Sequence, residues 1–511
     1  MKVQTAHGRN GVVATGHGLA TDAALAVLKD GGNAADAAVV SALVLAVVCP
    51  YATTLGGDVY ALVYDKSGKI SGLNGTGCSP ASANADRFKD GVPGGGPLAA
   101  TIPGLLRGLA DLNAKFGSRD FASLMTPAIK LAEDGFSVHR QLAANTADRA
   151  ALLMKNDAAK ALFLPGGKPL VEGDRFVQPE LAQILRTVQA GGVNAFYRGG
   201  LAQKMAGASD AIGGLFTEED FAAHCSLWQE PIAAPFYGHD VVTMPPNSFG
   251  ATLLFQLLDL EAADIGAGDP NGLDFILKGY EARRVAYRQA AKLIADPRMS
   301  EDKLRRALAD AIAGQSREAT PIPAEARDRC TTCAVAIDRD GMAVSLIESV
   351  SAPYGSGVVL DGTGILLNNR MAGFNNDPAS DNVVAPKKRP ANTLAPCLVT
   401  KNGKLVMSLG TPGTVGQTCT LAQFLARVLA CGEDAAVAAE TPRWSVDFAG
   451  KLVVEDTMEA GLRQAVLARN PEAKPMREGW ISFGSIKLAM VDDGNYSGVA
   501  DHRRVATTAS W

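Results

Sequence analysis

The stretch RCTTCAVAIDRDG, residues 329–341, places the cysteines Cys330 and Cys333 on either side of the threonines Thr331 and Thr332. A CxxC pair can bind a metal ion, can cycle as a redox disulfide, or can lie in a buried strand without a chemical role. A threonine at the head of a strand can also act as a nucleophile, provided that a base removes the proton of its hydroxyl.

Metal and redox chemistry find little support in the rest of the sequence. A structural zinc site needs four ligands, but there is no second close cysteine pair and the six histidines are scattered. A thioredoxin-like CxxC opens a helix, whereas the alternating pattern over 333–349 predicts strand, turn and strand. We therefore expect no metal site and a small buried side chain at Cys333, with a zinc or redox protein as the alternative from another class.

Thr331 becomes chemically competent if the chain is cut in front of it. Cleavage of the peptide bond between Cys330 and Thr331 frees an α-amine with an ordinary pKa of about 7.7 to 8.0. That amine can take the proton of the hydroxyl on the same residue, so the mechanism needs no histidine. Cleavage after Arg329 instead makes Cys330 the nucleophile, which is a second version of the same chemistry.

The elements that must position this site follow from periodicity. Long apolar or amphipathic stretches predict helices at 19–32, 33–48, 105–117 and 415–432, and alternating stretches predict strands at 59–70, 331–338, 342–349, 357–369 and 395–410. The charged segment 299–329 predicts an exposed approach to position 330. Strands with helices on both flanks favour a layered sandwich.

The composition excludes several classes of protein. Of 511 residues, 47% are hydrophobic and 20% charged, with 49 basic against 53 acidic side chains, so no basic excess indicates nucleic acid. The most apolar window, 34–48, carries Asp36 and is shorter than the about 20 residues that cross a membrane. Sparse cysteines and no signal-like apolar run at the start predict a cytoplasmic protein that acts on a small molecule.

Several stretches, taken in order, resemble the γ-glutamyltranspeptidase family of N-terminal nucleophile hydrolases. They are the segments 11–65 and 102–138, then TTCAVAIDRDGMAVSLIES (331–349), GILLNNRM (364–371), KKRP (387–390), GTPGT (410–414) and DHRR (501–504). The resemblance implies an α+β fold, a four-layer αββα sandwich. It also implies a precursor that cleaves itself into a large subunit, 1–330, and a small subunit, 331–511, which together form one domain. No metal or cofactor is implied, and a higher homo-oligomer stays open.

The resemblance also implies roles for individual residues. Thr331 matches the nucleophile and new N-terminus, released from Cys330, and Ser349 takes the place of a threonine that holds and polarises the nucleophile. The backbone N–H groups of Gly413 and Thr414 match the oxyanion hole. Further matches are positions that contact substrate in the family: Ser351, Asn392 and Thr393.

Three departures from the family pattern bear on the substrate. Thr76 stands where the family has an arginine for the substrate's α-carboxylate, and Gly373 where an acid holds the α-ammonium. Arg370 replaces a glutamine, so the site gains a positive charge while it loses an acid. These changes favour a small amide with a carboxylate and no amine. On this hypothesis Arg370 binds the anionic group of the substrate; the alternative is that it only pairs with a structural carboxylate. Thr76 either forms part of the pocket wall or lies in a loop without a role in binding.

The resulting hypothesis is an amidohydrolase for linear, non-peptide amides that works through an acyl-enzyme on Thr331. The best guess for the substrate is oxamate, cut to oxalate and ammonia in purine breakdown, because family members with that activity are similar in these respects. The alternative within the family is a γ-glutamyl hydrolase or transpeptidase, or a glutaryl (cephalosporin) acylase. An uncleaved binding scaffold is a further alternative, and the sequence leaves open whether an acceptor amine competes with water.

Overall fold

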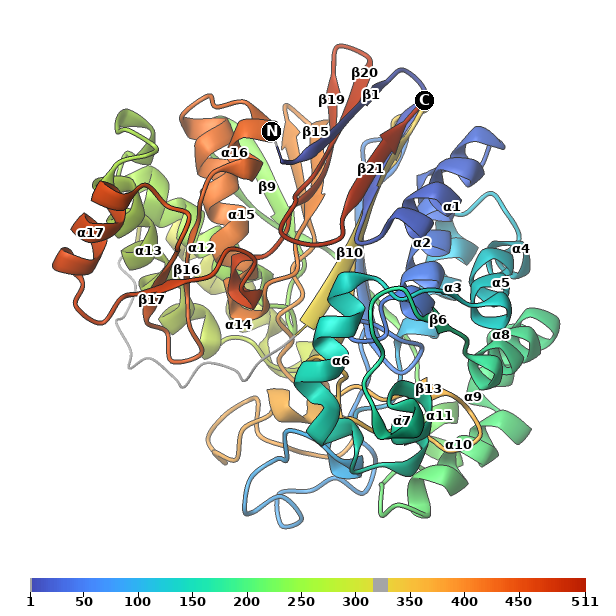
Figure 1. Cartoon of the computed structure of the whole chain (residues 1–511). Helices are drawn as coiled ribbons and strands as arrows, with labels where there is room; N and C mark the ends of the chain where they lie inside the picture. Colours follow the sequence, from blue (N-terminus) through green and yellow to red (C-terminus); the bar gives the residue numbers. More distant parts are fainter. Residues whose placement is uncertain (1, 316–329) are drawn as a thin grey trace.

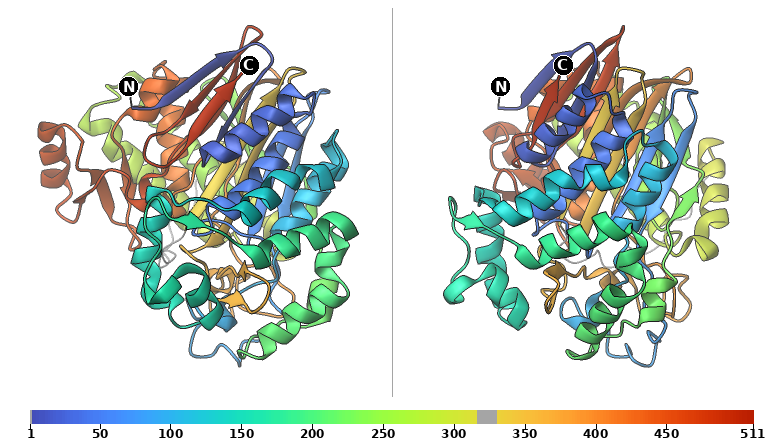
Figure 2. Two further views of the ribbon diagram at one scale, coloured as in Figure 1. Left: turned by 45° about the vertical axis from the view of Figure 1, so that its right-hand side comes forward. Right: turned by 90° about the vertical axis from the view of Figure 1, so that its right-hand side faces the viewer.

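Two β-sheets packed face to face form the centre of the molecule, and helices cover the outer face of each, as Figure 1 and Figure 2 show. This computed structural model describes residues 2–315 and 330–511. Buried side chains of both sheets meet between them, among them Tyr60, Ile347 and Leu398. The arrangement is the four-layer αββα sandwich that the sequence predicts.

Each sheet contains seven strands within the described residues, and all neighbouring strands are antiparallel. The first sheet has the order β1 (Gln4–Gly8), β20 (Asn495–Ala500), β19 (Lys487–Asp492), β15 (Lys404–Gly410), β14 (Cys397–Lys401), β9 (His239–Thr243) and β8 (Ile232–Phe236). The second has the order β21 (Thr507–Ser510), β2 (Gly11–Thr15), β10 (Cys330–Asp338), β11 (Ala343–Ser351), β3 (Asp58–Tyr64), β4 (Ile70–Gly75) and β7 (Leu227–Gln229).

Strands from before and after residue 331 are interleaved in both sheets. In the second sheet, β10 and β11 lie between β2 and β3, which belong to the N-terminal part of the chain. In the first sheet, β14 pairs with β9, and β20 pairs with β1. The two segments that the predicted cleavage would create therefore share one core.

Helix α2 (Ala34–Val48) is the main cover of β10 and β11, and it matches the helix predicted at 33–48. All of its residues are buried, as expected of a helix that is apolar on every side. Asn33 and Asp36 form a capping box at its start, each side chain accepting a hydrogen bond of 3.0 Å from the backbone N–H of the other.

The remaining helices complete the two outer layers. Over the second sheet and below it lie α1 (Gly18–Lys29), α3 (Leu105–Phe116), α4 (Phe121–Leu124), α5 (Thr126–Asp134), α6 (Arg140–Leu153), α7 (Asp157–Phe163), α8 (Pro179–Gly191), α9 (Asn194–Tyr197), α10 (Gly200–Asp210) and α11 (Glu218–Ala222). On the side of the first sheet lie α12 (Gly250–Ala262), α13 (Leu273–Ala291), α14 (Pro297–Ile312), α15 (Gln417–Leu425), α16 (Ala435–Glu440) and α17 (Ala460–Arg469).

Two predictions need correction or fall outside the description. The stretch 357–369, predicted as strand, forms only the short pair β12 (Val359–Leu360) and β13 (Ile365–Leu366), because a turn at 361–364 with two positive-φ glycines, Gly362 and Gly364, interrupts it. The segment 299–329, predicted as an exposed approach, begins within α14, and residues 316–329 lie outside the described residues.

Candidate active site

Thr331 lies at an irregularity between the two central strands. Cys330 pairs with Ser351 and Thr332 pairs with Glu348, so Ser349 and Val350 of β11 both lie opposite Thr331 alone. Such a β-bulge bends the strand and redirects side chains, and bulges are common beside active sites. Cys330 and Thr331 are joined within β10, so the contacts around Thr331 are those of the intact chain.

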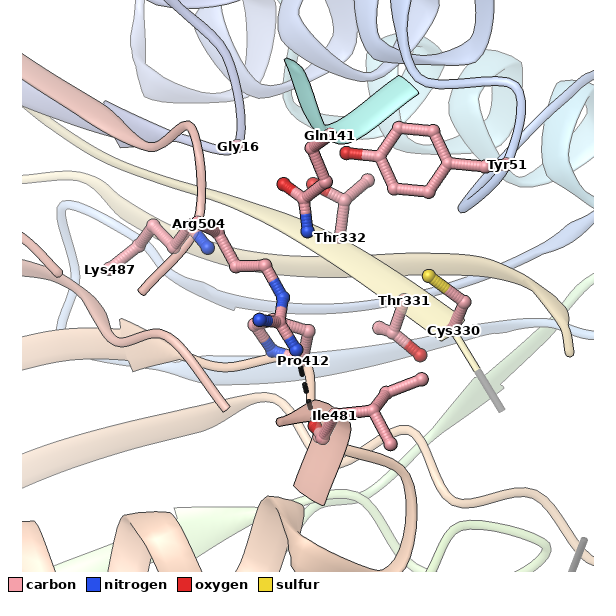
Figure 3. Close-up of a pocket in the computed structure, with 11 residues that line it drawn as sticks. Gly16, Tyr51, Gln141, Cys330, Thr331, Thr332, Pro412, Ile481, Lys487 and Arg504 are labelled. Atoms are coloured by element: carbon pink, nitrogen blue, oxygen red, sulfur yellow. Dashed lines mark hydrogen bonds between the residues drawn. The ribbon is translucent and has the colours of Figure 1, made fainter. Parts of the chain in front are cut away.

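The hydroxyl of Thr331 is buried and has no hydrogen-bond partner among the described residues. It lines a cavity of about 20 Å³, which is room for one water molecule. Figure 3 shows this cavity, with Thr331 and Cys330 at the start of β10 and Ile481 and Arg504 beside them. A buried polar atom without a partner calls for an explanation, and a reacting hydroxyl provides one.

Ser349 contacts the bond that the predicted cleavage breaks. Its Oγ donates a hydrogen bond of 2.5 Å to the carbonyl oxygen of Cys330, and it accepts one of 2.8 Å from the N–H of Ser351. Ser351, at the end of the bulge, has a positive φ of 81°. Both serines predicted for the site therefore lie beside the bond between Cys330 and Thr331. In the intact chain Ser349 bonds to the carbonyl of Cys330 and not to the hydroxyl of Thr331, so its predicted role in polarising Thr331 stays a prediction.

Gly413 and Thr414 lie at the turn after β15, and Gly413 lines the cavity of Thr331. Neither backbone N–H has a hydrogen-bond partner in the described part of the chain. Thr414 has a φ of 56°, a left-handed conformation that is strained for a β-branched residue. Unpaired N–H groups near Thr331, the predicted nucleophile, are compatible with the oxyanion hole that the resemblance implies, which stays a prediction.

Asp58 is a site residue that the sequence analysis missed. It lies directly opposite Ser349 in the register of β3 and β11, so the two side chains share a face about 4.5 to 5.5 Å apart at Cβ. Its carboxylate accepts hydrogen bonds from Gly77 N–H at 2.9 Å and from Asn392 Nδ2 at 3.3 Å. The only sequence signal was an acid at the start of a predicted buried strand, after two glycines.

Arg370 forms a fully buried ion pair with Asp58, with 3.0 Å between Nε and Oδ2. Burial raises the pKa of the Asp58 carboxyl to about 6, although Arg370 acts in the opposite direction. Nη1 and Nη2 of Arg370 have no partner among the described residues. Asp58 is therefore the structural carboxylate that the alternative interpretation of Arg370 requires. The two terminal nitrogens of the guanidinium form no hydrogen bond with the described residues. Arg370 is absent from the lining of the small cavity at Thr331, so its role as an anchor stays a prediction.

Thr76 and Thr393 lie in the same buried region but differ in their contacts. Thr76 Oγ1 donates to Asn74 Oδ1 at 2.7 Å and accepts from Asn247 Nδ2 at 3.4 Å, so its hydroxyl is held by its own loop. Thr393 Oγ1 is buried without a partner in the described residues. Of the two, only Thr393 has a hydroxyl without a hydrogen-bond partner among the described residues.

Two cations also line the cavity of Thr331: the sequence analysis gave Lys487 no role, and it included Arg504 only as the last residue of the DHRR stretch, 501–504. Lys487, the first residue of β19, donates through Nζ to Ser485 O and Oγ at 3.1 Å each, and burial lowers the pKa of its ammonium group. Arg504 donates from Nη1 to Gly479 O at 2.6 Å. Both lie far from residue 331 in the sequence, so no pattern around residue 331 places them at this cavity.

The two cysteines that bracket the threonines are buried. Burial raises the pKa of the Cys330 thiol and of the Cys333 thiol to about 11, which keeps both protonated and disfavours Cys330 as the nucleophile. Cys333 packs between the sheets with Ile347 and Leu398. Within the described residues no group of histidine, cysteine or acidic side chains has the arrangement of a metal site, and no helix is long and apolar enough to span a membrane.

Comparison with known proteins agrees with this geometry. Glutathione hydrolase proenzyme of Escherichia coli strain K12 is 32% identical over 97% of this chain and 91% of its own length. Glutathione hydrolase-like YwrD proenzyme of Bacillus subtilis strain 168 is 34% identical over 86% and 85%. The crystal structure of cephalosporin acylase from Bacillus halodurans has a TM-score of 0.89 and 30% identity, and covers 99% of this chain and 97% of that one. The sequence model of γ-glutamyltranspeptidase matches residues 20–511, and the chain therefore belongs to the γ-glutamyltranspeptidase family of autoprocessed N-terminal nucleophile hydrolases.

Proposed function

We propose that this protein cleaves itself before Thr331 and then hydrolyses a small, carboxylate-bearing amide through an acyl-enzyme on that residue. The observation that carries the substrate class is Arg370, a buried guanidinium whose Nε lies 3.0 Å from Asp58 Oδ2 as an ion pair, while none of its three nitrogens has a hydrogen-bond partner among the described residues. A fork of two N–H donors fits a carboxylate in a bidentate way. Asp58 lies across from Ser349, so this fork belongs to the region of the scissile bond.

Self-cleavage follows from the contacts of the precursor. Oγ1 of Thr331 attacks the carbonyl carbon of Cys330, while the hydrogen bond from Ser349 stabilises the negative charge on the carbonyl oxygen. The bond from that carbon to the nitrogen of Thr331 breaks, and the nitrogen leaves as an amine with the hydroxyl proton. Water then hydrolyses the resulting ester, which gives Cys330 a carboxylate and Thr331 a free amine and hydroxyl.

In turnover, the new amine of Thr331 serves as the base. It takes the hydroxyl proton as Oγ1 attacks the amide carbon of the substrate, and it passes that proton to the leaving amine. The N–H groups of Gly413 and Thr414, which are unpaired in the described structure, donate to the oxygen that becomes negative. Water then attacks the acyl-enzyme and releases the acid.

The absence of a clamp for an α-amino acid supports a substrate without an ammonium group. The hydroxyl of Thr76 is engaged by Asn74, and it carries no charge for an α-carboxylate. At Gly373 a Cβ atom would lie 2.5 Å from the carbonyl oxygen of Ala391, so the backbone there leaves no room for an acidic side chain. Oxamate, with its carboxylate next to the amide, is the smallest candidate, and purine breakdown in the cytoplasm is the setting that we propose for it.

A screen over amides tests this function. Purified protein is first sequenced from its N-termini, where a fragment that begins at Thr331 is expected, and ammonia release is then measured with oxamate and longer dicarboxylic monoamides. γ-Glutamyl anilide and glutaryl anilide represent the alternative, which the names of the glutathione hydrolase and cephalosporin acylase relatives favour. Faster hydrolysis of γ-glutamyl anilide than of every carboxylate-bearing primary amide would refute the proposed substrate class.

A further inference from the structure

A wider hollow adjoins the cavity of Thr331, between α6 and the loop at 477–481. Its volume is about 760 Å³, and Gln141, Cys330, Ile481 and Arg504 line both spaces. Since Cys330 carries the carbonyl of the bond that is cut, the hollow begins at the scissile bond. A volume of this size suits a drug-sized molecule and far exceeds what an ammonia leaving group needs.

The charge of the hollow is positive. Five arginines and two acids line it. Of these, Arg503 is paired with Glu455 and Asp501 at 2.6 and 3.2 Å, and Glu478 is engaged by Lys2 and His502 at 3.1 and 3.0 Å. Arg140, at the start of α6, and Arg477 are exposed and form no ion pair within the part of the chain that the structure describes. Their guanidinium groups are therefore available to an anion in the hollow.

One wall of the hollow is aromatic. Trp480 and Phe448 both line it, with their ring centroids 5.7 Å apart, and the Trp480 side chain is half-buried. Half-buried aromatic rings offer flat apolar surface on which another ring can stack. A flat wall next to unpaired arginines selects for a ligand that is both flat and anionic.

We propose that this hollow binds the amine half of a substrate and is built for a flat amine with an anionic group, of the aminobenzoate type. The inference rests on the proposed function for its reaction, in which water and the amide give a carboxylic acid and this amine. The acyl half then lies toward Arg370, and the amine half extends from the scissile carbon into the hollow.

The test compares amides that share one acyl group. N-Phenyl oxamate and its 4-carboxyphenyl analogue share the acyl group and differ by one carboxylate on the leaving amine. We expect kcat/KM about three- to tenfold higher for the 4-carboxyphenyl amide, since an exposed ion pair contributes modestly, and we expect added salt to reduce the ratio. Arg140→Gln and Arg477→Gln should each lower this ratio, whereas Arg87→Gln, an exposed arginine outside the hollow, should leave it unchanged.

Direct binding separates this inference from the proposed function. Binding of 4-aminobenzoate and of its neutral analogue 4-aminobenzamide to the mature protein is measured by quenching of tryptophan fluorescence. The Trp480→Phe variant, which lacks the tryptophan of the hollow, serves as the reference. Tighter binding of 4-aminobenzoate, weakened by Arg140→Gln and Arg477→Gln, supports the hollow even if no oxamate derivative is hydrolysed. Equal binding of the two compounds, or a preference that both variants retain, overturns the inference even if oxamate itself is a substrate.

Discussion

The side-chain hydroxyl of Ser349 donates a hydrogen bond of 2.5 Å to the carbonyl oxygen of Cys330. The bulge of β11 makes this contact possible, because it sets two residues of β11 against Thr331 alone. The N–H of Ser351 donates to the same hydroxyl and thereby directs its proton toward Cys330. In the intact chain the carbonyl of Cys330 thus has a hydroxyl donor of its own, and we propose that this donor stabilises the oxyanion of self-cleavage separately from the N–H groups of Gly413 and Thr414.

Ser349→Ala should slow self-cleavage without preventing folding. Loss of one oxyanion donor lowers the rate by about 10²- to 10³-fold. The serine side chain is small, so its replacement by alanine removes few contacts and should not prevent folding. The fraction of intact chain on denaturing gels, followed over time after purification, measures the rate. Ser349→Thr keeps the hydroxyl and should cleave, while Thr331→Ala should not cleave at all. Cleavage of Ser349→Ala at the wild-type rate would show that the contact has no role in maturation.

Thr414→Gly should remain active, because the proposed contribution of residue 414 is its backbone N–H. Glycine adopts the φ of 56° without strain, and that gain opposes the about 0.5 to 1 kcal/mol that glycine costs in chain entropy. We expect a change in the free energy of unfolding within about 1 kcal/mol and kcat within a few-fold of the wild type. A loss of activity comparable to that of a catalytic deletion would assign the role to the Thr414 hydroxyl instead.

Much of the scaffold was predictable, because periodicity along the chain determines it. The apolar run at 34–48 is a buried helix, and the alternation after residue 330 places Thr331 at the head of a central strand. The environment of the site was harder to predict. Asp58 meets Arg370, and Lys487 reaches the cavity of Thr331, through contacts between segments far apart in the sequence. The residue types around Thr331 were enough to predict the kind of reaction. The pairing of Asp58 with Arg370 and the position of Lys487 depend on how the chain packs in three dimensions, which the sequence pattern does not show.

Cleavage before Thr331 should leave the two fragments bound to each other. β10 and β11 of the second fragment lie between β2 and β3 of the first, so separation would expose buried surface and break strand pairing on both sides. The expected result is one peak in native gel filtration that resolves into two bands on a denaturing gel. Separate elution of the fragments in buffer without denaturant would contradict the shared core.

The ion pair of Asp58 and Arg370 should be strongly coupled. Asp58→Asn leaves a buried arginine without its counter-charge, a change that costs about 3 to 5 kcal/mol in comparable buried pairs. Arg370→Met removes the charge as well, so the double variant should be more stable than the sum of the single effects. Urea unfolding of all four proteins in the uncleaved Thr331→Ala background gives the coupling energy. Additive effects would mean that the two side chains do not interact in the folded protein.

Acid should destabilise the protein through His17 and His139. Burial lowers the pKa of both imidazoles to about 4, and their Nδ1 atoms accept hydrogen bonds from the N–H groups of Leu19 and Leu142 at the starts of α1 and α6. The unfolded chain, with histidine pKa values near 6.5, binds more protons than the folded chain between pH 6.5 and about 4. The stabilisation is therefore complete above pH 6.5 and is lost as the pH falls toward 4, by up to about 3 kcal/mol for each group.

His139→Asn keeps a capping oxygen that does not titrate, so its urea midpoint should fall less steeply over this range than that of the wild type. His7→Asn, at an exposed position, is the matched control, and equal slopes for both variants would rule out His139 as a source of the acid sensitivity.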